Sequence, residues 1–126
     1  MNKPRVGLIT FGDERDDMWE KVFGNLTMPR HKRLKDHLES LDIQLYSNEE
    51  AARSRDQING QVDALLVADV DVLVAHTPCW TSPNLVLHGI QRLGKPVALV
   101  TSKSAATHGM VGFFGAGGAL NQIGID

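Results

Sequence analysis

The sequence predicts an α/β protein in which a parallel β-sheet lies between layers of helices. Three observations indicate this fold class. Apolar runs typical of strands alternate along the chain with stretches of helical periodicity. The runs are short, continuous and rich in β-branched residues, as in the segment 70–76, which is typical of strands buried on both faces. The length of 126 residues suits a single domain with one core.

The first third of the chain predicts one strand followed by two helical segments. Residues 5–11 form an apolar run that ends at Gly12, and they predict the first strand. Acidic residues, which favour the start of a helix, precede apolar residues at helical spacing over 16–23. We expect Pro29 to interrupt this helix and to begin a second one, which continues over 30–41.

The middle of the chain predicts a second strand and a long helix. Residues 42–46 alternate between polar and apolar side chains, which is typical of a half-buried strand. Ser47 and Asn48 are suitable N-caps, so we expect a helix over 49–68. Gly60 lowers the helical propensity within this segment.

The rest of the chain predicts two more strands, each followed by a helix. Residues 70–76 predict the third strand, and 84–93 predict a helix that ends at Gly94. Residues 96–101 predict the fourth strand. A glycine-rich stretch over 109–123 keeps an apolar helical pattern, so we expect a helix whose glycine face packs closely on a neighbour.

Four strand–helix units in succession imply a parallel sheet with helices on both faces, which is a three-layer α/β/α architecture. The expected strand order is 2-1-3-4, the flavodoxin-like arrangement of an open parallel sheet. The carboxyl ends of the first and third strands are then neighbours. We therefore expect a ligand-binding crevice between residues 12–15 and residues 77–84.

Composition argues against several classes of function. A net charge of −2 without a basic cluster offers no footprint for nucleic acid or for a membrane surface, so we expect neither partner. No apolar run reaches the roughly 18 residues of a membrane helix. The single cysteine, Cys79, rules out a disulfide within the chain, and the N-terminus lacks a signal-peptide pattern. We expect a soluble cytoplasmic domain.

Trp80 is the most conspicuous candidate for a ligand contact. It lies just beyond the third predicted strand, between Pro78 and Pro83, where ligands bind in open α/β sheets. Tryptophan offers a rigid apolar face and one N–H donor, which suits stacking on a sugar ring. The alternative is a loop tryptophan that folds onto its own domain.

The histidines and the cysteine are weaker candidates. His76 and His108 lie at the binding edge, where either could hydrogen-bond a polar ligand or be satisfied by local backbone. We expect His31 and His37 on helix surfaces, and their spacing does not form a metal site. We expect Cys79 to be a small, half-buried apolar residue rather than a nucleophile.

Two other classes of function stay open. The first is a stand-alone flavodoxin- or receiver-like binding or signalling module. The acidic first loop would repel a flavin phosphate, and Asp13, Glu14 and Lys103 match a receiver site only loosely because the third strand does not end in an acid. The second is a structural interaction domain that assembles through Gly115 and Gly118.

Three segments carry a resemblance to a known family. They are Arg5-Val6-Gly7-Leu8-Ile9 with Gly12, Thr77-Pro78-Cys79-Trp80, and Phe113-Phe114-Gly115-Ala116-Gly117-Gly118-Ala119-Leu120. With these segments the chain resembles, over nearly all of its length, the N-terminal domain of the L-fucose isomerase and L-arabinose isomerase family. The Thr-Pro-Cys-Trp segment is more specific than the first strand.

The resemblance implies that residues 1–126 are the flavodoxin-like N-terminal domain of a longer aldose–ketose isomerase. Enzymes of this family are homo-oligomers and use a divalent metal, commonly manganese, whose ligands lie in later domains together with the acid and base carboxylates. The resemblance therefore implies no catalytic residue and no metal site in this chain. The partners it implies are the remaining domains, neighbouring subunits and a small sugar.

The resemblance also implies a substrate-closing role, because the N-terminal domain of one subunit helps to close the active site of its neighbour. Trp80 matches the tryptophan that takes part in this closure. Arg15 is the nearest match to an arginine that follows the first strand, although Asp13 and Glu14 displace it. Asn84 is included for its position at the same edge, where the alternative role is a helix cap.

Overall fold

The structure of the protein is a computed structural model that describes residues 3–101. The predicted glycine-rich helix over 109–123, with Gly115 and Gly118, lies outside the described residues, as do His108 and Lys103.

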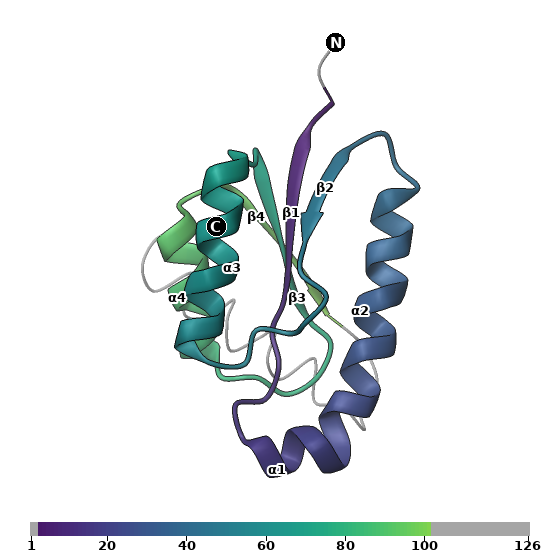
Figure 1. Cartoon of the computed structure of the whole chain (residues 1–126), viewed down its shortest axis with the longest axis vertical. Helices are drawn as coiled ribbons and strands as arrows, with labels where there is room; N and C mark the ends of the chain where they lie inside the picture. Colours follow the sequence, from purple (N-terminus) through teal and green to yellow (C-terminus); the bar gives the residue numbers. More distant parts are fainter. Residues whose placement is uncertain (1–2, 102–126) are drawn as a thin grey trace.

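The described residues form an open sheet of four parallel strands with the order β2-β1-β3-β4, as Figure 1 shows. The strands are β1 (Arg5–Thr10), β2 (Gln44–Ser47), β3 (Val72–Thr77) and β4 (Val97–Thr101). This confirms the predicted flavodoxin-like order. The two central strands, β1 and β3, pair in parallel with Thr10 opposite His76.

Helices cover both faces of the sheet, so the predicted three-layer architecture is confirmed. Helix α2 (Gly24–Glu39) lies on one face, while α3 (Arg55–Ala68) and α4 (Pro83–Leu93) lie on the other (Figure 1). Between the sheet and α3/α4 lies the larger apolar cluster, whose fully buried members include Ile9, Phe11, Ile58, Val62, Leu73 and Val86. Beneath α2 the smaller cluster consists of Val6, Leu8 and Val74, with half-buried leucines of α2 packed against it.

The first helical segment runs on into the second without a break at Pro29. A short helix α1 (Asp16–Met18) leads into a π-helical stretch, η1 (Trp19–Phe23), and then into α2. The predicted interruption is therefore wrong, since Pro29 lies inside α2. The N–H that proline lacks would have bonded to the carbonyl of Asn25, which is an exposed residue.

The helix that was expected to begin at residue 49 begins six residues later, so this prediction is wrong. The N-cap of α3 is Ser54, whose hydroxyl accepts a hydrogen bond from the N–H of Gln57 at 3.2 Å. Residues 48–54 instead form a loop that continues the sheet. Within it, Ala52 donates to the carbonyl of Thr10 at 2.7 Å and accepts from the N–H of Gly12 at 3.0 Å.

Helix α4 matches its prediction closely. It begins after Ser82 and ends at Gly94, whose φ of 68° lies in the left-handed region that glycine tolerates best. Its buried residues include Val86 and Ile90, which pack on the sheet. Among the described residues, no helix combines the length and the apolarity needed to cross a membrane.

We predict opposite effects on stability for two glycine substitutions. A Cβ at Gly24, the first residue of α2 after the π-helical stretch, would lie 2.6 Å from the backbone oxygen of Trp19, so Gly24→Ala should destabilise the fold by about 1–3 kcal/mol. A Cβ at Gly60, within α3, would meet no atom within 4 Å, so Gly60→Ala should stabilise it by about 0.5–1 kcal/mol. Urea unfolding of both variants measures the difference, and equal effects would contradict the π-helical geometry.

Candidate functional site

The loops that follow β1 and β3 lie side by side at the carboxyl edge of the sheet, as the strand order predicts. The N–H of Phe11 donates to the carbonyl of His76 at 2.9 Å, which extends the pairing of the two strands. The hydroxyl of Thr81 donates to the carbonyl of Gly12 at 3.2 Å. This second bond joins the loop that carries Trp80 to the loop that carries Arg15.

Arg15 is held in place by a buried carboxylate. Its Nε donates to Oδ1 of Asp13 at 3.0 Å, its Nη2 to Oδ2 at 2.6 Å, and its backbone N–H to Oδ1 at 2.9 Å. The Asp13 side chain is fully buried, whereas that of Arg15 is 54% exposed. Burial alone raises the pKa of the Asp13 carboxyl, but the hydrogen bonds from Arg15 and the charges of Arg15 and Arg53 outweigh it, so the pKa lies below its ordinary value.

Arg53 and Trp19 form a second part of this edge that the sequence analysis missed. Arg53 donates from Nε to the carbonyl of Asp13 at 3.0 Å and from Nη2 to Oδ1 of Asp16 at 2.7 Å. Its guanidinium carbon lies 4.7 Å from the centre of the Trp19 ring, a cation–π contact. No local pattern marks Arg53, because the predicted long helix placed it on a helix rather than in the loop beside Gly12.

Trp80 and Asn84 lie on the segment that connects β3 to α4. Trp80 is half-buried between the fully buried residues Cys79 and Thr81. Asn84 is exposed and is the second residue of α4, whereas Ser82 occupies the N-cap, so the alternative role of Asn84 as a cap is wrong. Cys79 was expected to be half-buried, and that prediction is wrong because the cysteine lies beneath η1 and α2.

The structure brings two of the three predicted site residues onto adjoining loops. Trp80 and Arg15 are linked through the bond between Thr81 and Gly12. Within residues 3–101, no hydrogen bond joins the side chains of Trp80, Arg15 and Asn84 to one another.

A chain of buried polar groups links α2 to the central strands. Oγ1 of Thr10 lies 2.6 Å from Nδ1 of His31 and 3.0 Å from Nδ1 of His76, while Nε2 of His31 lies 2.9 Å from the carbonyl oxygen of Asn48. The prediction that His31 lies on a helix surface is wrong, since only 4% of it is exposed. Its spacing from Leu34 and Leu38, three and seven residues on, marks the sheet-facing side of α2.

The donor and acceptor roles in this chain of polar groups are assigned from the carbonyl of Asn48, which can only accept. Nε2 of His31 therefore carries a proton. Because burial lowers the pKa of His31 and so favours the neutral ring, Nδ1 of His31 accepts from the hydroxyl of Thr10. The oxygen of Thr10 then accepts from Nδ1–H of His76. Both imidazoles are neutral in this arrangement, and Nε2 of His76 keeps a lone pair.

The surroundings favour the neutral form of both rings. Burial, together with the nearby His31 and the charge of Arg30, lowers the pKa of His76 to about 4. Burial is also the main cause that lowers the pKa of His31. Arg30 is anchored nearby, where its Nη1 donates to the carbonyl of Pro78 at 3.0 Å.

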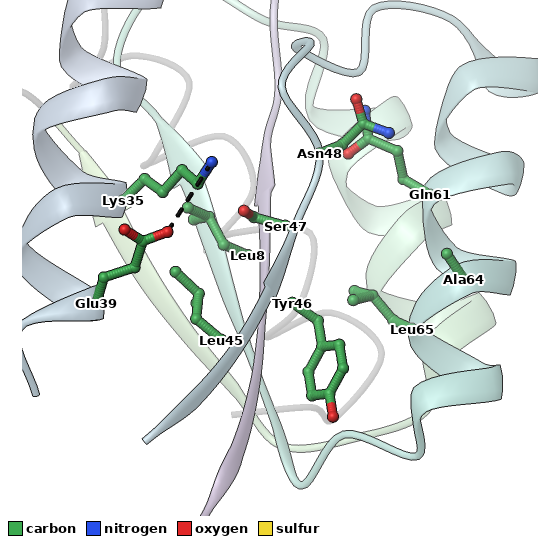
Figure 2. Close-up of a pocket in the computed structure, with 10 residues that line it drawn as sticks. All are labelled: Leu8, Lys35, Glu39, Leu45, Tyr46, Ser47, Asn48, Gln61, Ala64 and Leu65. Carbon is green, nitrogen blue, oxygen red and sulfur yellow. Dashed lines mark ion pairs between the residues drawn. The ribbon is translucent and has the colours of Figure 1, made fainter. Parts of the chain in front are cut away.

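A separate hollow of about 370 Å³ lies around the edge strand β2, on the side of β1 that faces away from β3. Figure 2 shows that β2 passes through it, with Lys35 and Glu39 of α2 on one side and Gln61 of α3 on the other. Lys35 and Glu39 form an ion pair at 3.9 Å. None of the predicted site residues lines this hollow.

No metal-binding group is found in the part of the chain that the structure describes, where no three His, Cys, Asp or Glu side chains are suitably grouped. Comparisons of the chain with protein-family models, characterised proteins and solved structures find no match. The resemblance to the isomerase family therefore stays a prediction that its sequence motifs carry.

We predict that the protein loses stability as the pH falls from about 6.5 to about 4. The pKa of His76 drops from 6.5 to about 4 on folding, so between these values the unfolded chain binds the proton that the folded protein excludes. His76 alone accounts for on the order of 3 kcal/mol of the free energy of unfolding across this range. Urea unfolding at a series of pH values measures the slope.

His76→Gln should flatten this pH dependence, because the titrating ring is gone. The matched control is His37→Gln, since His37 is an exposed residue of α2, and it should keep the parent slope. An unchanged slope in His76→Gln would contradict the assignment of the pH dependence to this ring.

Proposed function

We propose that this chain is the substrate-closing and oligomer-forming N-terminal domain of a metal-dependent aldose–ketose isomerase of the fucose and arabinose isomerase type. The observation that carries the proposal is the bond between Thr81 and Gly12, which holds the Trp80 loop against the Arg15 loop. An aromatic face and a guanidinium thus share the edge at which open α/β sheets bind ligands. This combination suits a sugar, which offers apolar C–H faces and hydroxyl groups.

In this proposal the domain binds and orients the sugar and excludes water. The half-buried indole of Trp80 stacks on a C–H face of the sugar. Two nitrogens of Arg15 donate to Asp13, so Nη1, which has no partner among residues 3–101, is left to donate to a sugar hydroxyl. Because the carboxylate fixes the guanidinium before the sugar arrives, little side-chain entropy is lost on binding.

The chemical step of such an isomerase needs groups other than these. In such an enzyme a bound divalent metal, commonly manganese, would polarise adjacent sugar oxygens, and a base would move a proton between neighbouring carbons. The described residues do not group into a metal site, so the proposal assigns the metal and the acid–base carboxylates to other domains of the enzyme. We expect the 126-residue chain alone, supplied with manganese, to show no isomerase activity.

The alternative, a stand-alone flavodoxin- or receiver-like module, has less support from the geometry. A receiver needs an accessible carboxylate after the first strand, whereas Asp13 is fully buried and bonded to Arg15. A flavin phosphate would meet the acidic residues of the same loop. Yellow colour with flavin absorbance, or labelling by a small phosphodonor, would favour this alternative.

We predict that L-fucose or L-arabinose perturbs Trp80 and leaves Trp19 unchanged. The chain has two tryptophans, so NMR resolves two indole N–H signals, which Trp19→Phe and Trp80→Phe assign. Binding of the sugar by this domain without the rest of the enzyme should be weak, with a dissociation constant on the order of 1 mM or higher. Arg15→Met should weaken the response, whereas Lys32→Met, on the exposed side of α2, should not. A sugar response confined to Trp19 would overturn the proposed role of Trp80.

We predict that the purified chain self-associates, because the proposal makes it part of an oligomer. Val67 is 90% exposed and its neighbour Leu66 is 45% exposed near the end of α3, and exposed neighbouring apolar side chains favour association. Light scattering over a range of concentrations measures the mass. Val67→Lys should reduce association if this surface takes part, and a strictly monomeric parent at high concentration would contradict the oligomeric role.

A further inference from the structure

The chain of buried polar groups ends at His76, which has no part in the sugar contacts proposed for Trp80 and Arg15. Its other members are Asn48, His31 and Thr10. His76 lies at the carboxyl end of β3, opposite Thr10 of β1, and four residues before Trp80. It therefore belongs to the same edge of the sheet as Trp80. Only 5% of its surface is exposed, so nearly all of the ring is enclosed by protein.

The direction of the hydrogen bonds leaves this ring with one unused acceptor. Nδ1–H of His76 donates to Thr10, and Nε2 has no hydrogen-bond partner among residues 3–101. Among the described residues, the buried side-chain atoms without a partner are Oγ1 of Thr27 and Oγ1 of Thr77, and Nε2 of His76 is not one of them. Solvent therefore reaches Nε2, and a ligand hydroxyl can take the place of water there.

The nearby charge restricts which donor suits this position. Arg30 lies close enough to His76 to disfavour a positive charge on the ring, and its Nη1 is fixed to the carbonyl of Pro78. A cationic donor such as an ammonium group would meet the same repulsion. A neutral hydroxyl group donates a hydrogen bond without bringing a positive charge.

We propose that Nε2 of His76 accepts a hydrogen bond from a hydroxyl group of a neutral polyhydroxylated ligand bound at this edge. Thr10 and His31 are positioning residues, which act by holding His76 in the tautomer that presents a lone pair. The inference rests on the proposed function in taking the ligand to be a sugar. It adds His76 as a ligand-contacting residue and makes the hydroxyl of Thr10 necessary for that contact.

Two substitutions of Thr10 distinguish the effect of its hydroxyl on His76 from the effect of its side-chain volume on packing. Thr10→Val keeps the shape of the buried side chain but removes the hydroxyl, so Nδ1–H of His76 loses its acceptor and the ring is free to adopt the Nε2–H tautomer. Thr10→Ser keeps the hydroxyl and is the matched control. Thr10 is buried at the end of β1, where the β-branched valine suits the strand, although the loss of the hydroxyl also leaves Nδ1 of His31 without its donor.

The experiment is long-range ¹⁵N NMR of the histidine rings, which distinguishes a protonated ring nitrogen from one with a lone pair. In the parent protein we expect the Nδ1–H tautomer for His76 and the Nε2–H tautomer for His31. Titration with L-fucose or L-arabinose should then shift the Nε2 signal of His76. Thr10→Val should weaken the sugar response about threefold to tenfold, and Thr10→Ser should change it by less than about twofold.

The indole signal of Trp80, recorded in the same titration, separates this inference from the proposed function. Shifts at both His76 and Trp80 support both. A shift at Trp80 without a shift at His76 overturns the inference alone. An Nε2–H tautomer for His76 in the parent protein also overturns it, and this measurement does not depend on the folding of any variant. A shift at His76 alone supports the inference and counts against the lid role of Trp80. No response at either residue overturns both.

Discussion

The register between the two central strands determines which polar side chains meet between the sheet and α2. Pairing of β1 with β3 places Thr10 opposite His76, on the face of the sheet that α2 covers. His31 then reaches both the strand ends and the backbone at Asn48. A slip of one residue would turn Thr10 to the opposite face of the sheet, because side chains alternate along a strand. The hydrogen bonds from Thr10 to His31 and His76 would then be lost.

Two polar systems share the carboxyl edge and differ in kind. The polar chain through Thr10 is buried and neutral, and each donor or acceptor role in it is dictated by the neighbouring group. The network of Asp13, Arg15 and Arg53 is charged and partly exposed. The pair of Arg53 with the exposed Asp16 adds little stability, whereas the hydrogen bonds and charge of Arg15 compensate the burial of the Asp13 carboxylate. The buried carboxylate of Asp13 fixes the direction in which Arg15 points.

Sequence patterns failed where distant segments overrode local signals. Proline by its own chemistry favours a helix break, yet α2 continues through Pro29, which is exposed, as is Asn25 four residues earlier. Asn48 has the character of an N-cap, but its carbonyl accepts from His31, and the loop after it pairs with the end of β1. The true N-cap, Ser54, follows that loop.

Local patterns in the sequence are enough to predict the layers, the strand order and the position of Trp80 beyond β3, because periodicity and alternation are properties of neighbouring residues. Which polar groups meet depends on how distant segments pack together. Thr10 and His76 are 66 positions apart, and Arg53 reaches Asp13 across 40. Such contacts arise from how strands align and loops close, and no local pattern encodes a hydrogen bond between segments that far apart.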